Sequence, residues 1–65
     1  MVKFYMDNGA VIEVDITAGI KSVMRNVNKA KAAGEMYFAD GEHVRAFIDP
    51  HSITAIKAVP DRFVE

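Results

Sequence analysis

The segment that decides the fold is residues 17–34, which read TAGIKSVMRNVNKAKAAG. Its apolar residues recur at helical spacing and fall within an arc of about 120° at 100° per residue; they are Ile20, Val23, Met24, Val27 and Ala30. We therefore predict a helix over residues 18–33 whose apolar arc packs on a sheet.

The two ends of this helix carry recognisable signals. The hydroxyl of Thr17 is suited to accept from the free amides of the first turn, so we place the N-cap there. Gly34 adopts a positive φ without penalty and is expected at the C′ position. Lys31 falls within the apolar arc, where its long stem can cover apolar surface while the ammonium reaches water.

Two predicted strands, residues 2–6 and 10–16, precede the helix, since apolar and polar residues alternate along them. A two-residue Asn8-Gly9 turn would set Phe4 opposite Glu13 and mix the two faces. A three-residue loop, with Gly9 in the left-handed conformation, pairs Phe4 with Ile12. Because register follows the buried face, we predict the three-residue loop.

Three more strands are predicted after the helix, at residues 35–39, 43–49 and 53–59, the last stopped by Pro60. Asp40-Gly41-Glu42 is the expected turn of the second hairpin, which puts Met36 and Phe38 on the inner face with Val44, Ala46 and Ile48. Asp49-Pro50-His51-Ser52 is the next turn, in which Asp49 accepts from amides two or three residues on.

The predicted order is β-β-α-β-β-β, and the class is α+β. We expect one small domain over residues 1–65, with an antiparallel sheet of four or five strands, one helix packed on one face, and a frayed tail at residues 60–65. A chain of 65 residues without cysteine has no disulfide to stabilise it, so oligomerisation is expected.

One helix covers one face of such a sheet and leaves the other to solvent. The uncovered face is predicted to carry Tyr5, Val11, Tyr37 and Phe47, an apolar group that suits a homodimer interface with a polar rim. An edge strand pairing across a two-fold is the alternative. These aromatics are also able to stack nucleic-acid bases, but basic residues do not interleave with them.

The charged residues between Thr17 and Gly34 are all basic, although the net charge of the chain is −1. Lys21, Arg25 and Lys29 align at i, i+4 and i+8 opposite the apolar arc. An ordinary solvated face is one interpretation, and contact with phosphates or an acidic protein is the other.

No catalytic, metal or cofactor signature is visible. His43 and His51 do not have the spacing of a zinc site, and Ser52 beside His51 lacks a third orienting group. The N-terminus has no signal-peptide pattern, and no apolar run approaches the length of a membrane span, so we expect a cytoplasmic protein without membrane contact.

The stretch Gly41–Ile53 resembles a strand-turn-strand phrase of short bacterial and prophage proteins. The resemblance implies a small bacterial or phage accessory protein and no particular role. We therefore expect a non-enzymatic interaction module that acts as a homo-oligomer and binds a further protein. The alternative is a nucleic-acid-binding accessory protein that uses Lys21, Arg25 and Lys29.

Overall fold

The structure, a computed structural model, describes residues 1–59; the predicted tail at residues 60–65 lies outside the described residues. Along this part of the chain the elements are β1 (Val2–Met6), β2 (Val11–Val14), α1 (Ile20–Ala33), β3 (Tyr37–Asp40), β4 (Arg45–Ile48), the short 3-10 helix η1 (Pro50–Ser52) and β5 (Ile53–Ala58). The predicted class, the order β-β-α-β-β-β and the antiparallel pairing are confirmed.

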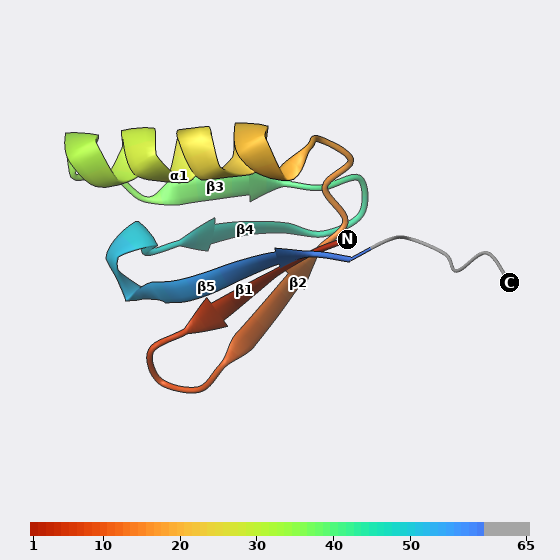
Figure 1. Ribbon diagram of the computed structural model, residues 1–65, viewed down its shortest axis with the longest axis horizontal. Coiled ribbons are helices and arrows are strands. Elements are labelled where there is room, and N and C mark those ends of the chain that lie inside the picture. The colour runs from red at the N-terminus through yellow and green to blue at the C-terminus, as the bar shows by residue number, and fades with distance from the viewer. Residues whose placement is uncertain (60–65) are drawn as a thin grey trace, which may run out of the picture.

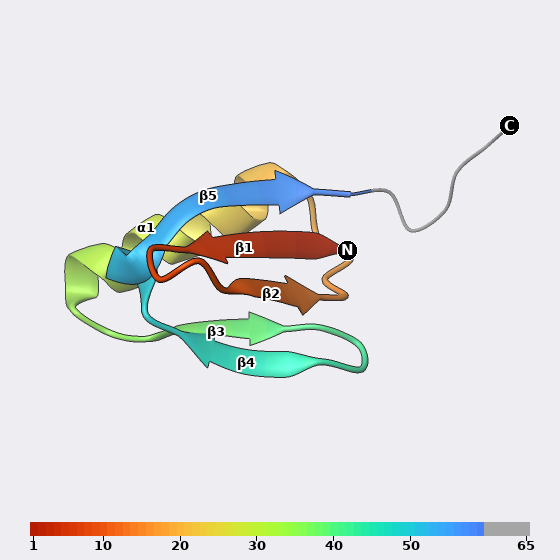
Figure 2. The ribbon, with the colours of Figure 1, turned by 90° about the horizontal axis from the view of Figure 1, so that it is seen from below.

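The five strands hydrogen-bond in two groups rather than in one continuous ladder. A three-stranded sheet has the order β2-β1-β5, and β3 pairs with β4 in a separate hairpin. Figure 1 shows α1 above β3, with β1, β2 and β5 at the opposite side of the molecule, and Figure 2 gives the view from below. The helix, the three-stranded sheet and the hairpin thus enclose one core from three sides.

The first hairpin has the predicted register. Phe4 pairs with Ile12 and Val2 with Val14. Gly9 has a φ of 89°, and the amide of Gly9 donates to the carbonyl of Met6 at 3.1 Å, which closes the three-residue loop. A residue with a side chain would be strained at this φ, so glycine fixes the loop length and with it the inner face.

The helix ends as predicted but starts two residues late. Gly34 has a φ of 69°, and the amides of Gly34 and Glu35 donate to Lys31 and Ala30 at 3.3 and 2.9 Å, the pattern of a Schellman motif. The N-cap is Gly19 and not Thr17, and no side chain caps the first turn. The Thr17 prediction was wrong because Gly19, in an extended conformation, provides the carbonyl that the amides of Ser22 and Val23 contact.

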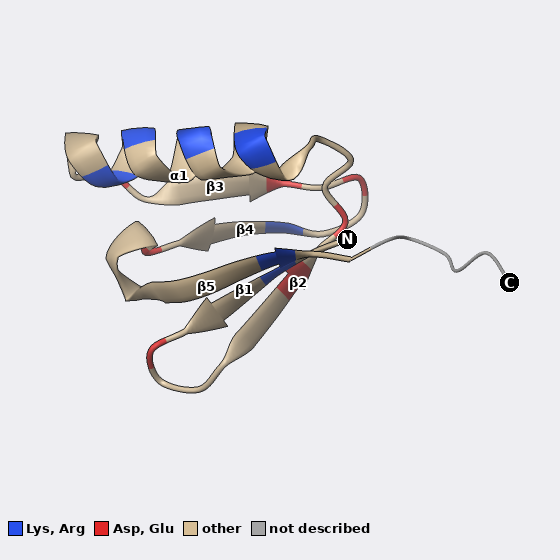
Figure 3. Cartoon of the chain, in the orientation of Figure 1, with Lys and Arg blue, Asp and Glu red and all other residues tan. Residues whose placement is uncertain are grey.

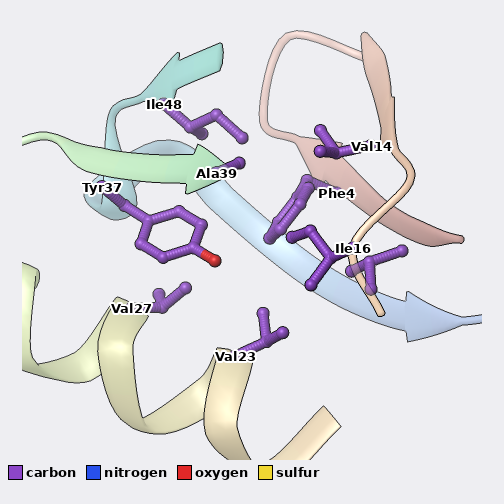
Figure 4. Close-up of a cluster of buried hydrophobic side chains, with 9 residues drawn as sticks. Phe4, Val14, Ile16, Val23, Val27, Tyr37, Ala39 and Ile48 are labelled. Carbon is purple, nitrogen blue, oxygen red and sulfur yellow. The ribbon is translucent and has the colours of Figure 1, made fainter. Parts of the chain in front are cut away.

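The core draws on every layer, as Figure 4 shows. Its buried members are Val2, Phe4, Val14, Ile16, Val23, Val27, Tyr37, Ala39 and Ile48. The rings of Phe4 and Tyr37 lie 5.7 Å apart, so the three-stranded sheet and the hairpin meet directly. Desolvation by this burial raises the pKa of Tyr37.

Three predictions about β3 were wrong. Tyr37 is 6% exposed and points into the core, whereas Phe38 and Met36, both assigned to the inner face, are 45% and 52% exposed. Val44, assigned to the same inner face, is 42% exposed. The register explains these errors. Asp40 pairs with Arg45 and Tyr37 with Ile48, so the hairpin loop is longer than Asp40-Gly41-Glu42, and the odd shift turns the opposite side chains inward.

The turn before β5 follows the prediction. A carboxylate oxygen of Asp49 accepts from the backbone amide of His51 at 3.0 Å, and the Asp49 carbonyl accepts from the amide of Ser52 at 3.1 Å. Pro50 is buried at the start of η1, where its fixed φ suits the first helical position.

Asp15 ties the three-stranded sheet to the hairpin. It follows β2, and its carboxylate accepts from the backbone amides of His43 at 2.8 Å and of Val44 at 3.0 Å. Nδ1 of the His43 ring lies 2.8 Å from the same carboxylate and must carry the proton, since a carboxylate only accepts. The carbonyl of Asp15 also accepts from the amide of Glu42 at 3.3 Å. These bonds fix the loop of the second hairpin against the end of β2.

These donors change the acidity of the group. The amide of Val44, followed by the His43 side chain and the His43 amide, lowers the pKa of Asp15 from 3.8 to about 2 against the opposing effect of desolvation.

We expect Asp15→Asn to destabilise the fold in a pH-dependent way. Because the folded-state pKa lies below the unfolded value, Asp15 stabilises the fold fully above pH 3.8, and this stabilisation is lost as the pH falls toward about 2. Urea unfolding of both proteins should show a difference in the free energy of unfolding that is large at neutral pH and closes as the pH falls from 3.8 toward about 2. Glu13→Gln, in the adjacent strand, is the control and should change stability less. A difference that does not change with pH would contradict the assignment of this stabilisation to the Asp15 carboxylate.

Candidate functional site

The outer face of the β3–β4 hairpin carries the most exposed aromatic surface of the described residues. Phe47 is 70% exposed and Phe38 is 45% exposed. Their rings lie 4.9 Å apart at 32°, as a directly opposed cross-strand pair. Met36, 52% exposed, has the same strand parity and extends the apolar area. We call Met36, Phe38 and Phe47 the aromatic patch.

A charged pair borders this patch. Asp40 and Arg45 are opposed across the hairpin two residues from the phenylalanines, and Nε of Arg45 lies 3.2 Å from an Asp40 carboxylate oxygen. Both side chains are largely exposed, so the pair adds little to stability. The face therefore has an apolar centre with one acid and one base at its rim.

Tyr5 and Val11 lie on the outer face of the three-stranded sheet. They are directly opposed in the β1–β2 ladder, beside the opposed pair Lys3 and Glu13, whose charged atoms are 4.0 Å apart. Val11 is 48% exposed, while Tyr5 is partly buried.

The predicted interface residues do not form one surface. Tyr37 is in the core, and the two sheets turn their inner side chains toward the same core (Figure 4). Their outer faces must then point away from each other, which puts Tyr5 and Val11 on a different side of the molecule from Phe47. The continuous outer face of the prediction is absent because β2 and β3 are not hydrogen-bonded neighbours.

The basic stripe runs along α1, where Figure 3 marks Lys and Arg positions in blue on successive turns of the helix. Lys21, Arg25 and Lys29 are all solvent-exposed, and none of the ion pairs among residues 1–59 includes them. The helix carries four bases and no acid, whereas the rest of residues 1–59 carries three bases and seven acids. The molecule is therefore polarised, with its positive charge concentrated on the helix.

The two histidines make contacts that support the fold. His43 contacts Asp15, and Nδ1 of His51 lies 3.6 Å from an Asp49 oxygen in the η1 turn. Within residues 1–59, no three histidine or carboxylate side chains gather in a way that would hold a metal ion.

Sequence reasoning missed Phe38 and Met36 as surface residues and Asp15 as a structural link. The segment Met36–Ala39 is apolar at every position, so alternation alone does not decide which parity is buried. The Asp15 contacts join residues 28 and 29 positions apart, and no local pattern signals them.

Comparison with protein-family models, curated proteins and solved structures finds no match for this chain. Among the described residues, no helix has the length and apolar character that crossing a membrane requires.

Proposed function

We propose that this chain is a non-enzymatic protein-interaction module, a small accessory protein of bacterial or phage type, that self-associates through the aromatic patch. The observation that carries the proposal is the exposed Phe38–Phe47 pair at 4.9 Å. Clustered exposed aromatics on a small domain are typical of interfaces, where aromatic residues contribute most of the binding energy.

The patch suits a second copy of itself. Consider a two-fold axis that lies above the outer face of the hairpin, parallel to β3 and β4 and midway between the two strands. It sets Phe38 of one copy over Phe47 of the other, and Asp40 of one copy over Arg45 of the other, because these residues are opposed in the hairpin. Apolar groups then meet apolar groups and each charge meets its opposite. Burial of the patch would also stabilise a 65-residue fold that has no disulfide.

Cross-linking tests which face is used. The chain has no cysteine, so a single introduced thiol reports on its own surroundings. We expect Met36→Cys to form covalent dimers rapidly with a bismaleimide reagent. Val11→Cys, on the other sheet and similarly exposed at 48%, should react no faster than a urea-unfolded sample. Equal cross-linking of the two variants would contradict the choice of face.

Nucleic-acid binding is the second candidate, and the unpaired positive charge of α1 favours it. In this case the protein should shift a short DNA duplex in a native gel at low salt. The Lys21→Glu substitution and added salt should each weaken the shift. An absence of any shift at about 100 µM protein would contradict this candidate, because non-specific binders reach that affinity.

A further inference from the structure

Two hollows lie along α1 and β5, and we call them together the seam. One hollow of about 400 Å³ is bordered by Met24 and Lys31 of the helix and by Ile53 and Ile56 of β5. A second hollow of about 340 Å³ is bordered by Ile20 at the start of α1 and by Ala58 at the end of β5. In Figure 2, which views the molecule from below, β5 passes in front of α1, and residues of both elements line the first hollow.

The helix leaves the seam incompletely covered. Met24 belongs to the apolar arc, yet it is 42% exposed, and Ile53 and Ile56 are only partly buried. The arc therefore has apolar surface on its β5 side that no described residue covers.

The strand beside the seam has a free edge. In the order β2-β1-β5, β5 pairs with β1 on one side and has no strand neighbour on the other among residues 1–59. A free edge presents backbone donors and acceptors to an added strand, and a peptide strand turns alternate side chains to one face. Such side chains would enter the two hollows.

The charge around the seam is of one sign. Lys31 lines it, and Lys21 and Arg25 lie on the adjoining side of the helix at 100° per residue, whereas Lys57 of β5 is opposed to Lys3 and lies on the outer face of the sheet. Neither α1 nor β5 carries an acidic residue. This charge favours an acidic occupant over a neutral or basic one.

We propose that the seam binds an extended acidic peptide of a partner protein, which adds to β5 as a strand, places apolar side chains in the two hollows and sets carboxylates against the lysines. The inference rests on the proposed interaction role and names the chemistry of the partner, but it uses residues separate from the aromatic patch.

The test is an NMR titration of the full chain with a capped short peptide that alternates glutamate with valine and isoleucine. We expect amide shifts concentrated in Ile53–Ala58 and along the Met24 side of α1, with a dissociation constant of about 1 mM or tighter. The same peptide with alternate backbone N-methyl groups loses its donors and should not bind. A version with lysine in place of glutamate should bind at least about tenfold more weakly.

A matched pair of helix variants locates the site. Met24→Glu puts a charge into the apolar hollow and should weaken binding about tenfold. Asn26→Glu makes the same change in acidic charge about 200° around the helix and should change affinity by less than about twofold. Both positions are exposed, so both variants should fold.

Three outcomes would overturn the proposal. They are the absence of any amide shift in β5 at about 1 mM peptide, equal binding of a glutamate-only peptide or a single-stranded oligonucleotide, and amide shifts centred on Phe38 and Phe47.

The titration is repeated with the Phe47→Asp variant. Unchanged peptide binding by that variant shows that the seam acts independently, so a failure of self-association and a failure of peptide binding remain distinguishable.

Discussion

Gly41→Ala is expected to destabilise the fold by about 3 kcal/mol, since overpacking a tight site forces neighbouring groups to shift. A Cβ atom at Gly41 would overlap the carboxylate of Asp15 and would lie 2.5 Å from the carbonyl oxygen of Val44 and 2.8 Å from Cγ1 of Val14. The carbonyl oxygen of Val44 cannot shift without disturbing a hydrogen bond, because it accepts from the Gly41 amide at 3.0 Å. The same methyl group would also displace the carboxylate that joins the hairpin to β2. Thermal unfolding should show a midpoint lower by about 4–8 °C for each kcal/mol.

Gly19→Ala is the matched control. Gly19 has a φ of −66°, and an added Cβ would meet no atom within 4 Å. This variant should change stability by less than about 1 kcal/mol, because the restriction of the unfolded chain by alanine offsets the poorer preference of alanine for the N-cap position. Similar losses in the two variants would show that Gly41 is not a tightly packed position.

Phe47→Asp is expected to weaken self-association about 30-fold or more, the effect of losing a central aromatic of an interface. Phe47 is 70% exposed within the single chain, so its replacement should lower the stability of the monomer by only about 1 kcal/mol, from the lost cross-strand pair and the poor strand propensity of aspartate. In the proposed two-fold arrangement, the new carboxylate would face the ring of Phe38 of the other copy. Light scattering during size-exclusion chromatography measures the change in mass, and circular dichroism checks the fold.

Val11→Asp is the control for that variant. Val11 is exposed on the outer face of the other sheet, so its replacement introduces the same charge outside the patch and should leave the dimer intact. Dissociation by Val11→Asp together with retention of the dimer by Phe47→Asp would assign the interface to the three-stranded sheet instead.

The parts of the fold that local rules govern could be predicted from the sequence. Gly9 and Gly34 adopt the positive φ expected of them, and each fixes the structure around it, the first hairpin register and the end of the helix. Asp49-Pro50 likewise forms its turn through contacts within three residues.

The register of the second hairpin could not be predicted, because a distant residue supports its loop. Asp15 binds the amides of His43 and Val44, which suits a longer loop than Asp40-Gly41-Glu42. That change turned Tyr37 inward and Phe38 outward, and it moved the candidate surface from a continuous sheet face to the hairpin. Of the predicted interface residues, Phe47 alone belongs to the aromatic patch.

Sedimentation equilibrium of the unmodified protein tests the central claim most directly. At tens of micromolar, the proposed association through the aromatic patch predicts an average mass near twice the 7.2 kDa of one chain, falling toward 7.2 kDa on dilution. A mass of 7.2 kDa at every concentration in that range would contradict self-association and with it the proposed role of the Phe38–Phe47 pair.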